Sequence, residues 1–209
     1  MDKPQVFWDA YRVRWEAKLE QWNDRCRREG WPHNSNQRNL AWSEWIIQAA
    51  EAACQDYADL LQRKVSVGRH TNCPIDVFAI EKNPQNTNVY EYVVAFESEQ
   101  KSHPGKGSWH KEFKDLCGTS AEIRVLASVF KVREGPSFRA KLEKWVESMR
   151  SHCKGPQGDF LLIFGPEWIS DEFPWLIYSL ERDFKLRPLT SAEPFIPRRV
   201  INRNKPREV

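Results

Sequence analysis

Three charged side chains, each two positions from the next, follow an apolar run near the middle of the chain. The segment VYEYVVAFESEQK ends on Glu97, Glu99 and Lys101. Alternate side chains of a strand point to the same face, so these three share a face with Val93 and Ala95 if the strand continues that far. Two carboxylates and an ammonium at a strand end are typical of a metal site.

A second apolar run carries a single acid that could complete such a site. In CPIDVFAI, Asp76 stands at the start of another predicted strand. Mg²⁺ prefers oxygen ligands and commonly takes only one or two protein carboxylates, with water and substrate phosphate in its remaining positions. Asp76 and Glu97 fit this need and predict a site for Mg²⁺ or Mn²⁺. Water bound to such a metal is a better nucleophile, which Glu99 or Lys101 could position.

The same acids also have interpretations that involve no chemistry. A single Asp in a strand commonly pairs with a backbone group or an Arg. Glu81 and Glu91 lie in or beside predicted strands as well, so acidic strand residues are not rare in this chain. Glu97 and Glu99 are therefore also consistent with a solvated strand end. The presence of Asp76 on a neighbouring strand is what favours a site.

Four further residues are accessory candidates. His103 and His110 flank a lysine cluster and could act as a base, although surface histidines are common in such loops. Glu44 and Glu51 are seven positions apart in a predicted helix and share one side of it. They could reach the site as extra ligands, or form part of a solvated helix face.

Basic residues gather in two places that could contact phosphate. One is the C-terminal segment PRRVINRNKPREV, and the other is a cluster of four lysines: Lys101, Lys106, Lys111 and Lys114. Of these we predict Lys106, Lys111 and Lys114 as nucleic-acid contacts. A solvated loop and a disordered tail are the alternatives. The net charge of +3 is too small to require a polyanionic partner by itself.

Hydrophobic spacing predicts the elements that must position these residues. We expect helices over about 5–29, 40–63 and 109–116 and after Ser137, with strands in KVSVGRH, IDVFAI, VYEYVVAFESE, EIRVLASVF, DFLLIFG and WLIYSLE. This order implies an α/β protein with a mixed sheet and helices on both sides. We divide the chain into a helical extension (1–38), an α/β core (39–190) and a basic Pro/Arg-rich tail (191–209).

The order helix, three-stranded meander, helix, strand, with acids on the second and third strands, resembles the PD-(D/E)xK nuclease superfamily. The matching residues are the Pro-Ile-Asp that ends on Asp76 and the Glu-Ser-Glu from Glu97 to Glu99. The resemblance implies a three-layer α/β/α, restriction endonuclease-like fold with a mixed central sheet. It also implies Mg²⁺ ligands at Asp76, Glu97 and the Ser98 carbonyl, with Glu99 orienting or activating water.

The chain departs from that family's pattern at two points. A residue is inserted before Asp76, and Glu99 stands where the family usually has a lysine, which gives an E-x-E variant. The alternative register, Glu99-Gln100-Lys101, restores the lysine but moves the pair toward the following loop. We prefer Glu97 and Glu99, because Glu97 is the first acid after the apolar run.

Composition excludes several classes of protein. With 209 residues, 40% of them apolar and 29% charged, the chain suits one compact domain with or without an extension. It has no apolar run long enough to span a membrane and no signal-peptide core, so we predict a cytoplasmic protein with no membrane partner. The five cysteines stand singly, which predicts reduced thiols.

These observations support three hypotheses about function. The first is a Mg²⁺-dependent nuclease that hydrolyses phosphodiester bonds of DNA. The second is a catalytically inactive module of the same fold that binds nucleic acid or a protein partner, because fold does not determine function. The third, compatible with either, is that the first forty residues mediate a homodimer.

Overall fold

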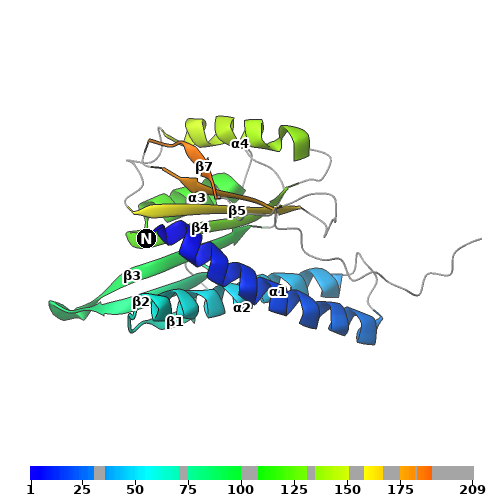
Figure 1. Ribbon diagram of the computed structural model, residues 1–209, viewed down its shortest axis with the longest axis horizontal. Coiled ribbons are helices and arrows are strands. Elements are labelled where there is room, and N and C mark those ends of the chain that lie inside the picture. The colour runs from blue at the N-terminus through cyan, green and yellow to red at the C-terminus, as the bar shows by residue number, and fades with distance from the viewer. Residues whose placement is uncertain are drawn as a thin grey trace, which may run out of the picture.

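The computed structural model describes residues 1–30, 36–70, 75–99, 108–130, 135–150, 158–166, 175–181 and 183–189. These residues form one mixed sheet and the helices on its two faces (Figure 1). The helices are α1 (Lys3–Glu29), α2 (Asn36–Leu60), α3 (Ser108–Gly118) and α4 (Gly135–Met149). The strands are β1 (Ser66–Arg69), β2 (Val77–Asn83), β3 (Asn86–Glu99), β4 (Ala121–Phe130), β5 (Asp159–Pro166), β6 (Leu176–Leu180) and β7 (Leu186–Pro188).

The strands lie in the sheet in the order of the sequence, from β1 to β7. The first three form an antiparallel meander, and β3, β4 and β5 then run parallel to one another. The sheet ends in two antiparallel strands, β6 and β7. The predicted α/β class with a mixed sheet is therefore confirmed. The prediction that EIRVLASVF forms a central strand is also confirmed, since β4 is the middle strand.

Helices cover both faces of the sheet, so the described chain has three layers (Figure 1). On one face, α1 and α2 share a hydrophobic cluster with the sheet, to which α2 contributes Ala49, Ala50 and Ala53. Such small side chains allow a helix to lie close to a sheet. On the other face, α3 and α4 pack through Trp109, Phe113 and further apolar residues. The apolar spacing of each helix thus corresponds to one buried face.

The N-terminal helix belongs to the core of the molecule. Phe7, Trp8, Tyr11 and Trp15 of α1 are at most 3% exposed. The rings of Trp15 and Trp175 meet edge to face, with their centroids 4.8 Å apart. Residues that we expected in an extension therefore complete the layer formed with α2, and the aromatic spacing of α1 reflects burial, as aromatic residues at helical spacing commonly do.

Two local features differ from the simple strand pattern. In the pairing of β2 with β3, Ala79 opposes Val94 and Ile80 opposes Tyr92, so Val93 is an extra residue at a β-bulge. Val93 and Val94 consequently belong to the same hydrophobic cluster. Val93 therefore does not share the face of Ala95 that simple alternation predicted. In addition, β7 was not predicted, because it has only three residues and one of them is proline.

The cysteines and the helices bear on the expected location. Cys54 is buried and free, as predicted, whereas Cys117 is disulfide-bonded, so the prediction of reduced thiols is wrong for Cys117. Single cysteines give no sign in the sequence of which ones the fold brings together. Disulfides are typical of oxidising compartments, and the cysteines no longer favour the cytoplasm. No helix among the described residues is long and apolar enough to cross a membrane.

Candidate functional site

The meander brings Asp76 to the end of β3. Asp76 directly precedes β2, and its backbone N–H donates to the carbonyl of Phe96 at 3.1 Å. Its carboxylate accepts a 2.8 Å hydrogen bond from the backbone N–H of Ser98. Because Ser98 lies between Glu97 and Glu99, this bond joins the two predicted motif elements side by side. The structure therefore brings together the acids that are 21 and more positions apart in the sequence.

Glu97 is a buried carboxyl group in an unusual environment. Its residue is 3% exposed, and its Oε1 atom is buried with no hydrogen-bond partner in the described structure. Burial, together with the negative charges of Asp76, Glu112 and Asp115, raises the pKa of Glu97 to about 9. A buried polar atom without a partner is costly, and a cation at this position would remove that cost.

Two acids that were not predicted come from α3. The side chain of Glu112 is 16% exposed, and that of Asp115 is 29% exposed. Burial raises the pKa of Glu112, the ammonium of Lys111 opposes this rise, and the charges of Asp115, Glu99 and Asp76 add to it. We refer to Asp76, Glu97, Glu99, Glu112 and Asp115 as the acid cluster.

A helical pattern could have identified Glu112. It lies three positions after Trp109 and four before Leu116, both of which are buried. Residues at these spacings share one side of a helix, so Glu112 flanks the face that packs on the sheet. The sequence does not show that this face lies over the end of β3, so it gives no reason to single out Glu112.

Asp76 and Glu99 complete the acid cluster at the end of the meander. Burial raises the pKa of Asp76, the bond from Ser98 opposes this rise, and the charge of Glu99 adds to it. The backbone carbonyl of Glu99 accepts a hydrogen bond from the hydroxyl of Ser128 in β4. The end of β3 is therefore attached to both neighbouring strands, which holds its carboxylates in place.

The residues of the acid cluster do not form a complete metal cage. In the described ranges, no three Asp, Glu, His or Cys side chains are grouped so that they could hold one metal ion. Asp76 and Glu97 could provide two carboxylate ligands, which is the number that Mg²⁺ commonly takes from a protein. The unpartnered Oε1 of Glu97 fits such a ligand. Water and a substrate phosphate would then supply the other oxygens.

The predicted basic residues are only partly described. Lys101 and Lys106 fall outside the described residues, as does His103. Lys111 and Lys114 are exposed on α3, as a phosphate contact requires. The Nζ atom of Lys111 also lies 3.2 Å from Asp115 Oδ2 and 3.7 Å from Glu112 Oε1.

The two helix acids considered as extra ligands are engaged elsewhere. Arg69 of β1 donates to Glu51 at 2.5 and 2.6 Å and to Glu44 at 2.8 and 3.0 Å. Hydrogen bonds from Arg69 lower the pKa of Glu44. With a guanidinium already shared between them, Glu44 and Glu51 serve to connect α2 with β1.

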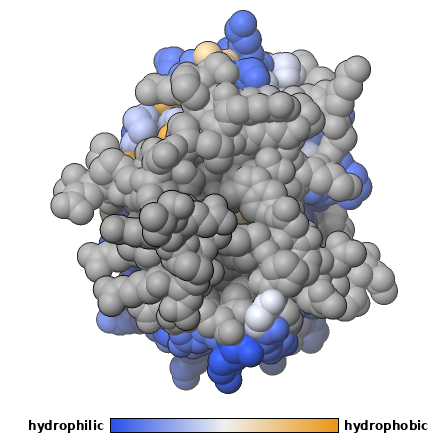
Figure 2. Space-filling view, turned by 90° about the vertical axis from the view of Figure 1, so that its right-hand side faces the viewer, coloured by the Kyte–Doolittle hydropathy of each residue, from blue (hydrophilic) through white to orange (hydrophobic). Residues whose placement is uncertain are grey.

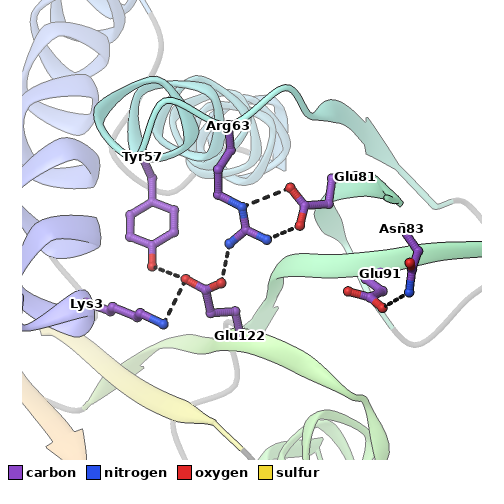
Figure 3. A network of polar contacts seen from close by, with 7 residues as sticks. All are labelled: Lys3, Tyr57, Arg63, Glu81, Asn83, Glu91 and Glu122. Atoms are coloured by element: carbon purple, nitrogen blue, oxygen red, sulfur yellow. Dashed lines mark hydrogen bonds and ion pairs between the residues drawn. The ribbon is translucent and has the colours of Figure 1, made fainter. Parts of the chain in front are cut away.

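A second group of acids lies near the start of β4, and its carboxylates are paired with cationic side chains (Figure 3). Arg63 bridges Glu81 of β2 and Glu122 of β4 with its guanidinium. Glu122 also accepts from the hydroxyl of Tyr57 at 3.2 Å and pairs with Lys3 at 3.1 Å. We call this group the Arg63 network. Its contacts connect both helices of one layer to two strands, so its role is structural.

The described surface at the lower edge of the molecule is hydrophilic (Figure 2). Figure 2 views the molecule from the right-hand side of Figure 1, toward which β3 runs. Hydrophilic residues dominate the described surface at the lower edge of this view, on the layer that contains α1 and α2. This edge offers charged and polar side chains to solvent.

Comparison with protein-family models, with curated proteins and with solved structures found no match to this chain.

Proposed function

We propose that this protein is a divalent-cation-dependent nuclease that hydrolyses phosphodiester bonds of DNA. One observation carries the proposal. The Asp76 carboxylate accepts a hydrogen bond from Ser98 at the end of β3, where Glu97 has a buried carboxylate oxygen without a hydrogen-bond partner in the described structure. A carboxyl group in such surroundings favours either a proton or a cation. Carboxylates that converge at adjacent strand ends are suited to hold a hard cation.

The topology supports the same proposal. The order α2, β1, β2, β3, α3, β4, with an antiparallel meander and a parallel fourth strand, is the order on which the resemblance to PD-(D/E)xK nucleases was based. Asp76 and Glu97 stand at the positions that correspond to that family's two acids. On this basis we propose a restriction endonuclease-like fold with an E-x-E variant of the motif.

Each residue would have a distinct task in hydrolysis. Asp76 and Glu97 would hold Mg²⁺ or Mn²⁺, which offsets the charge that develops on the phosphate. Glu99, the next residue on the same face of β3, would accept a hydrogen bond from the attacking water and orient it. Lys101 remains the candidate for this task in the alternative register. Lys106, Lys111 and Lys114 would contact the DNA backbone.

Cleavage of supercoiled plasmid DNA tests this proposal directly. We expect the wild-type protein to cleave in the presence of Mg²⁺ or Mn²⁺, and chelation with EDTA to stop it. Asp76→Asn and Glu97→Gln should each lower the rate by roughly 100-fold or more, because each removes a ligand charge. Glu91→Gln is the matched control, since Glu91 lies on β3 in the hairpin far from its end. Equal cleavage by all four proteins would contradict the proposal.

A binding module without catalysis is the second candidate. It is favoured by the finding that no three His, Cys, Asp or Glu side chains in the described ranges are grouped so that they could hold one metal ion. Calorimetry with Mn²⁺ separates the two candidates. Failure to take up the cation, combined with salt-dependent binding of DNA, would favour the binding module. Binding of a protein partner would instead leave DNA affinity weak at every salt concentration.

Assembly and location remain predictions as well. A homodimer would suit an enzyme that cuts both strands of DNA, and sedimentation of the full chain tests it. Because α1 contributes to the core, removal of the first forty residues is expected to unfold the chain. The cytoplasmic location can be tested by cell fractionation, and the disulfide at Cys117 is the observation that weighs against it.

A further inference from the structure

Lys111 occupies an unusual position for an exposed lysine. Its side chain is 68% exposed, yet its ammonium contacts two members of the acid cluster, Glu112 and Asp115. Its charge also opposes the rise in the pKa of Glu97, a buried residue of a different element. The ammonium therefore lies within electrostatic reach of carboxylates from both β3 and α3.

The acid cluster concentrates negative charge, so a nearby positive charge stabilises it more than it would stabilise an ordinary surface. Its five carboxylates come from the approach to β2, the end of β3 and one side of α3. Oε1 of Glu97 is buried without a hydrogen-bond partner in the described structure. In the cation-free protein, the Lys111 ammonium offsets part of this negative charge from the solvent side.

We infer that the Lys111 ammonium and a divalent cation compete for the charge of the acid cluster, so that Lys111 sets the affinity of the site for the cation. This inference rests on the cation-binding part of the proposed function. Because most of the Lys111 side chain is exposed, its ammonium can leave Glu112 and Asp115 without crossing the protein interior. Once displaced, it is available to a phosphate of the DNA backbone.

Repulsion between positive charges is the reason why we expect Lys111 to weaken, and not to strengthen, the binding of a divalent cation. Two positive charges at neighbouring positions repel each other, and a divalent ion feels the ammonium twice as strongly as a proton does. Removal of the Lys111 charge should therefore make binding of the divalent ion more favourable. Glu112 and Asp115 would at the same time be released from their ion pairs.

Calorimetric titration of the full chain with Mn²⁺, without DNA, tests the inference. Lys111→Gln is expected to bind Mn²⁺ roughly tenfold more tightly than the wild type at the same pH and ionic strength. Lys111→Arg keeps the charge and should bind like the wild type. Lys114→Gln is the matched control, because it removes the same charge from the same helix without an observed contact to the acid cluster. Its affinity should change by less than about twofold.

The outcomes separate this inference from the proposed function. Equal Mn²⁺ affinities in the wild type and Lys111→Gln, or weaker binding by Lys111→Gln, would overturn the inference and leave the nuclease proposal standing. A wild type that takes up no Mn²⁺ would overturn both. A Tm measured for each variant without the cation verifies that it folds, and Lys111→Arg provides the comparison if Lys111→Gln is unstable.

Discussion

Two groups of acids in this molecule have opposite electrostatic surroundings. In the Arg63 network, Glu81 and Glu122 each bond to a guanidinium, and the pKa of Glu122 is lowered despite its burial. In the acid cluster, the Lys111 ammonium contacts Glu112 and Asp115, Oε1 of Glu97 is buried without a hydrogen-bond partner in the described structure, and the pKa of Glu97 rises to about 9. The acids of the Arg63 network belong to β2 and β4, whereas those of the acid cluster lie directly before β2, at the end of β3 and on α3.

The contrast separates stability from function. Paired acids hold elements together, and Arg63 joins positions 18 and 59 residues away in the sequence. A buried carboxylate oxygen without a partner, such as Oε1 of Glu97 in the described structure, makes the folded state less stable, so a chain that retains it gains something else from it. Perturbed carboxyl groups at converging strand ends are therefore candidates for a functional site. Four variants and one pH profile test the difference between the two groups.

The largest expected effect on stability comes from the paired group. Arg63→Gln should lower the free energy of unfolding by about 2 kcal/mol, because it leaves two partly buried carboxylates without a guanidinium. Arg14→Gln is the control, since it breaks a bidentate pair with Asp56 in which the Arg14 side chain is 48% exposed. We expect the control to cost less than about 1 kcal/mol in urea unfolding. Similar losses in both variants would mean that the Arg63 network is not a structural clamp.

A smaller effect, of opposite sign, is expected in the acid cluster. Glu97→Gln should raise the free energy of unfolding by about 1 kcal/mol near pH 8, because the amide is neutral without the proton that Glu97 must take up on folding at this pH. Glu81→Gln removes an acid that is paired with Arg63 and should lower stability at the same pH. Urea unfolding of both variants gives the two signs. If both variants lose stability alike, the comparison between the two groups fails.

The pH dependence of stability follows from the same residue. The pKa of Glu97 is raised from 4.5 to about 9, so between these values the folded chain keeps a proton that the unfolded chain has lost. Stability therefore falls as the pH rises through this window, by at most about 1.4 kcal/mol per pH unit from this group. The slope between about pH 6 and about pH 8 should be smaller in Glu97→Gln. An unchanged slope would show that Glu97 is already ionised in the folded chain.

The sequence was sufficient for features that depend on local pattern. Apolar spacing identified the four helices and six of the described strands, although β3 continues past its apolar run to Glu99 and Glu97 is still buried. The alternation of strand residues also placed Glu97 and Glu99 on one side. These features depend on residues within a few positions of one another, which is the range that periodicity reports.

Features that depend on distant contacts were not predictable in the same way. Glu112 joins the acid cluster only because α3 lies over the end of β3, and Arg63 pairs with Glu122 across 59 positions. The bulge at Val93 reflects a mismatch between two strands and leaves no mark in either strand alone. Strand β7 is too short for a periodic signal.

Calorimetric titration with Mn²⁺ decides whether the acid cluster holds a divalent cation. We predict that the wild type and Glu81→Gln bind Mn²⁺, because the paired group plays no part in the site, and that Glu97→Gln and Asp76→Asn do not. Retention of wild-type affinity in Glu97→Gln and Asp76→Asn, or no uptake by the wild type, would contradict the claim.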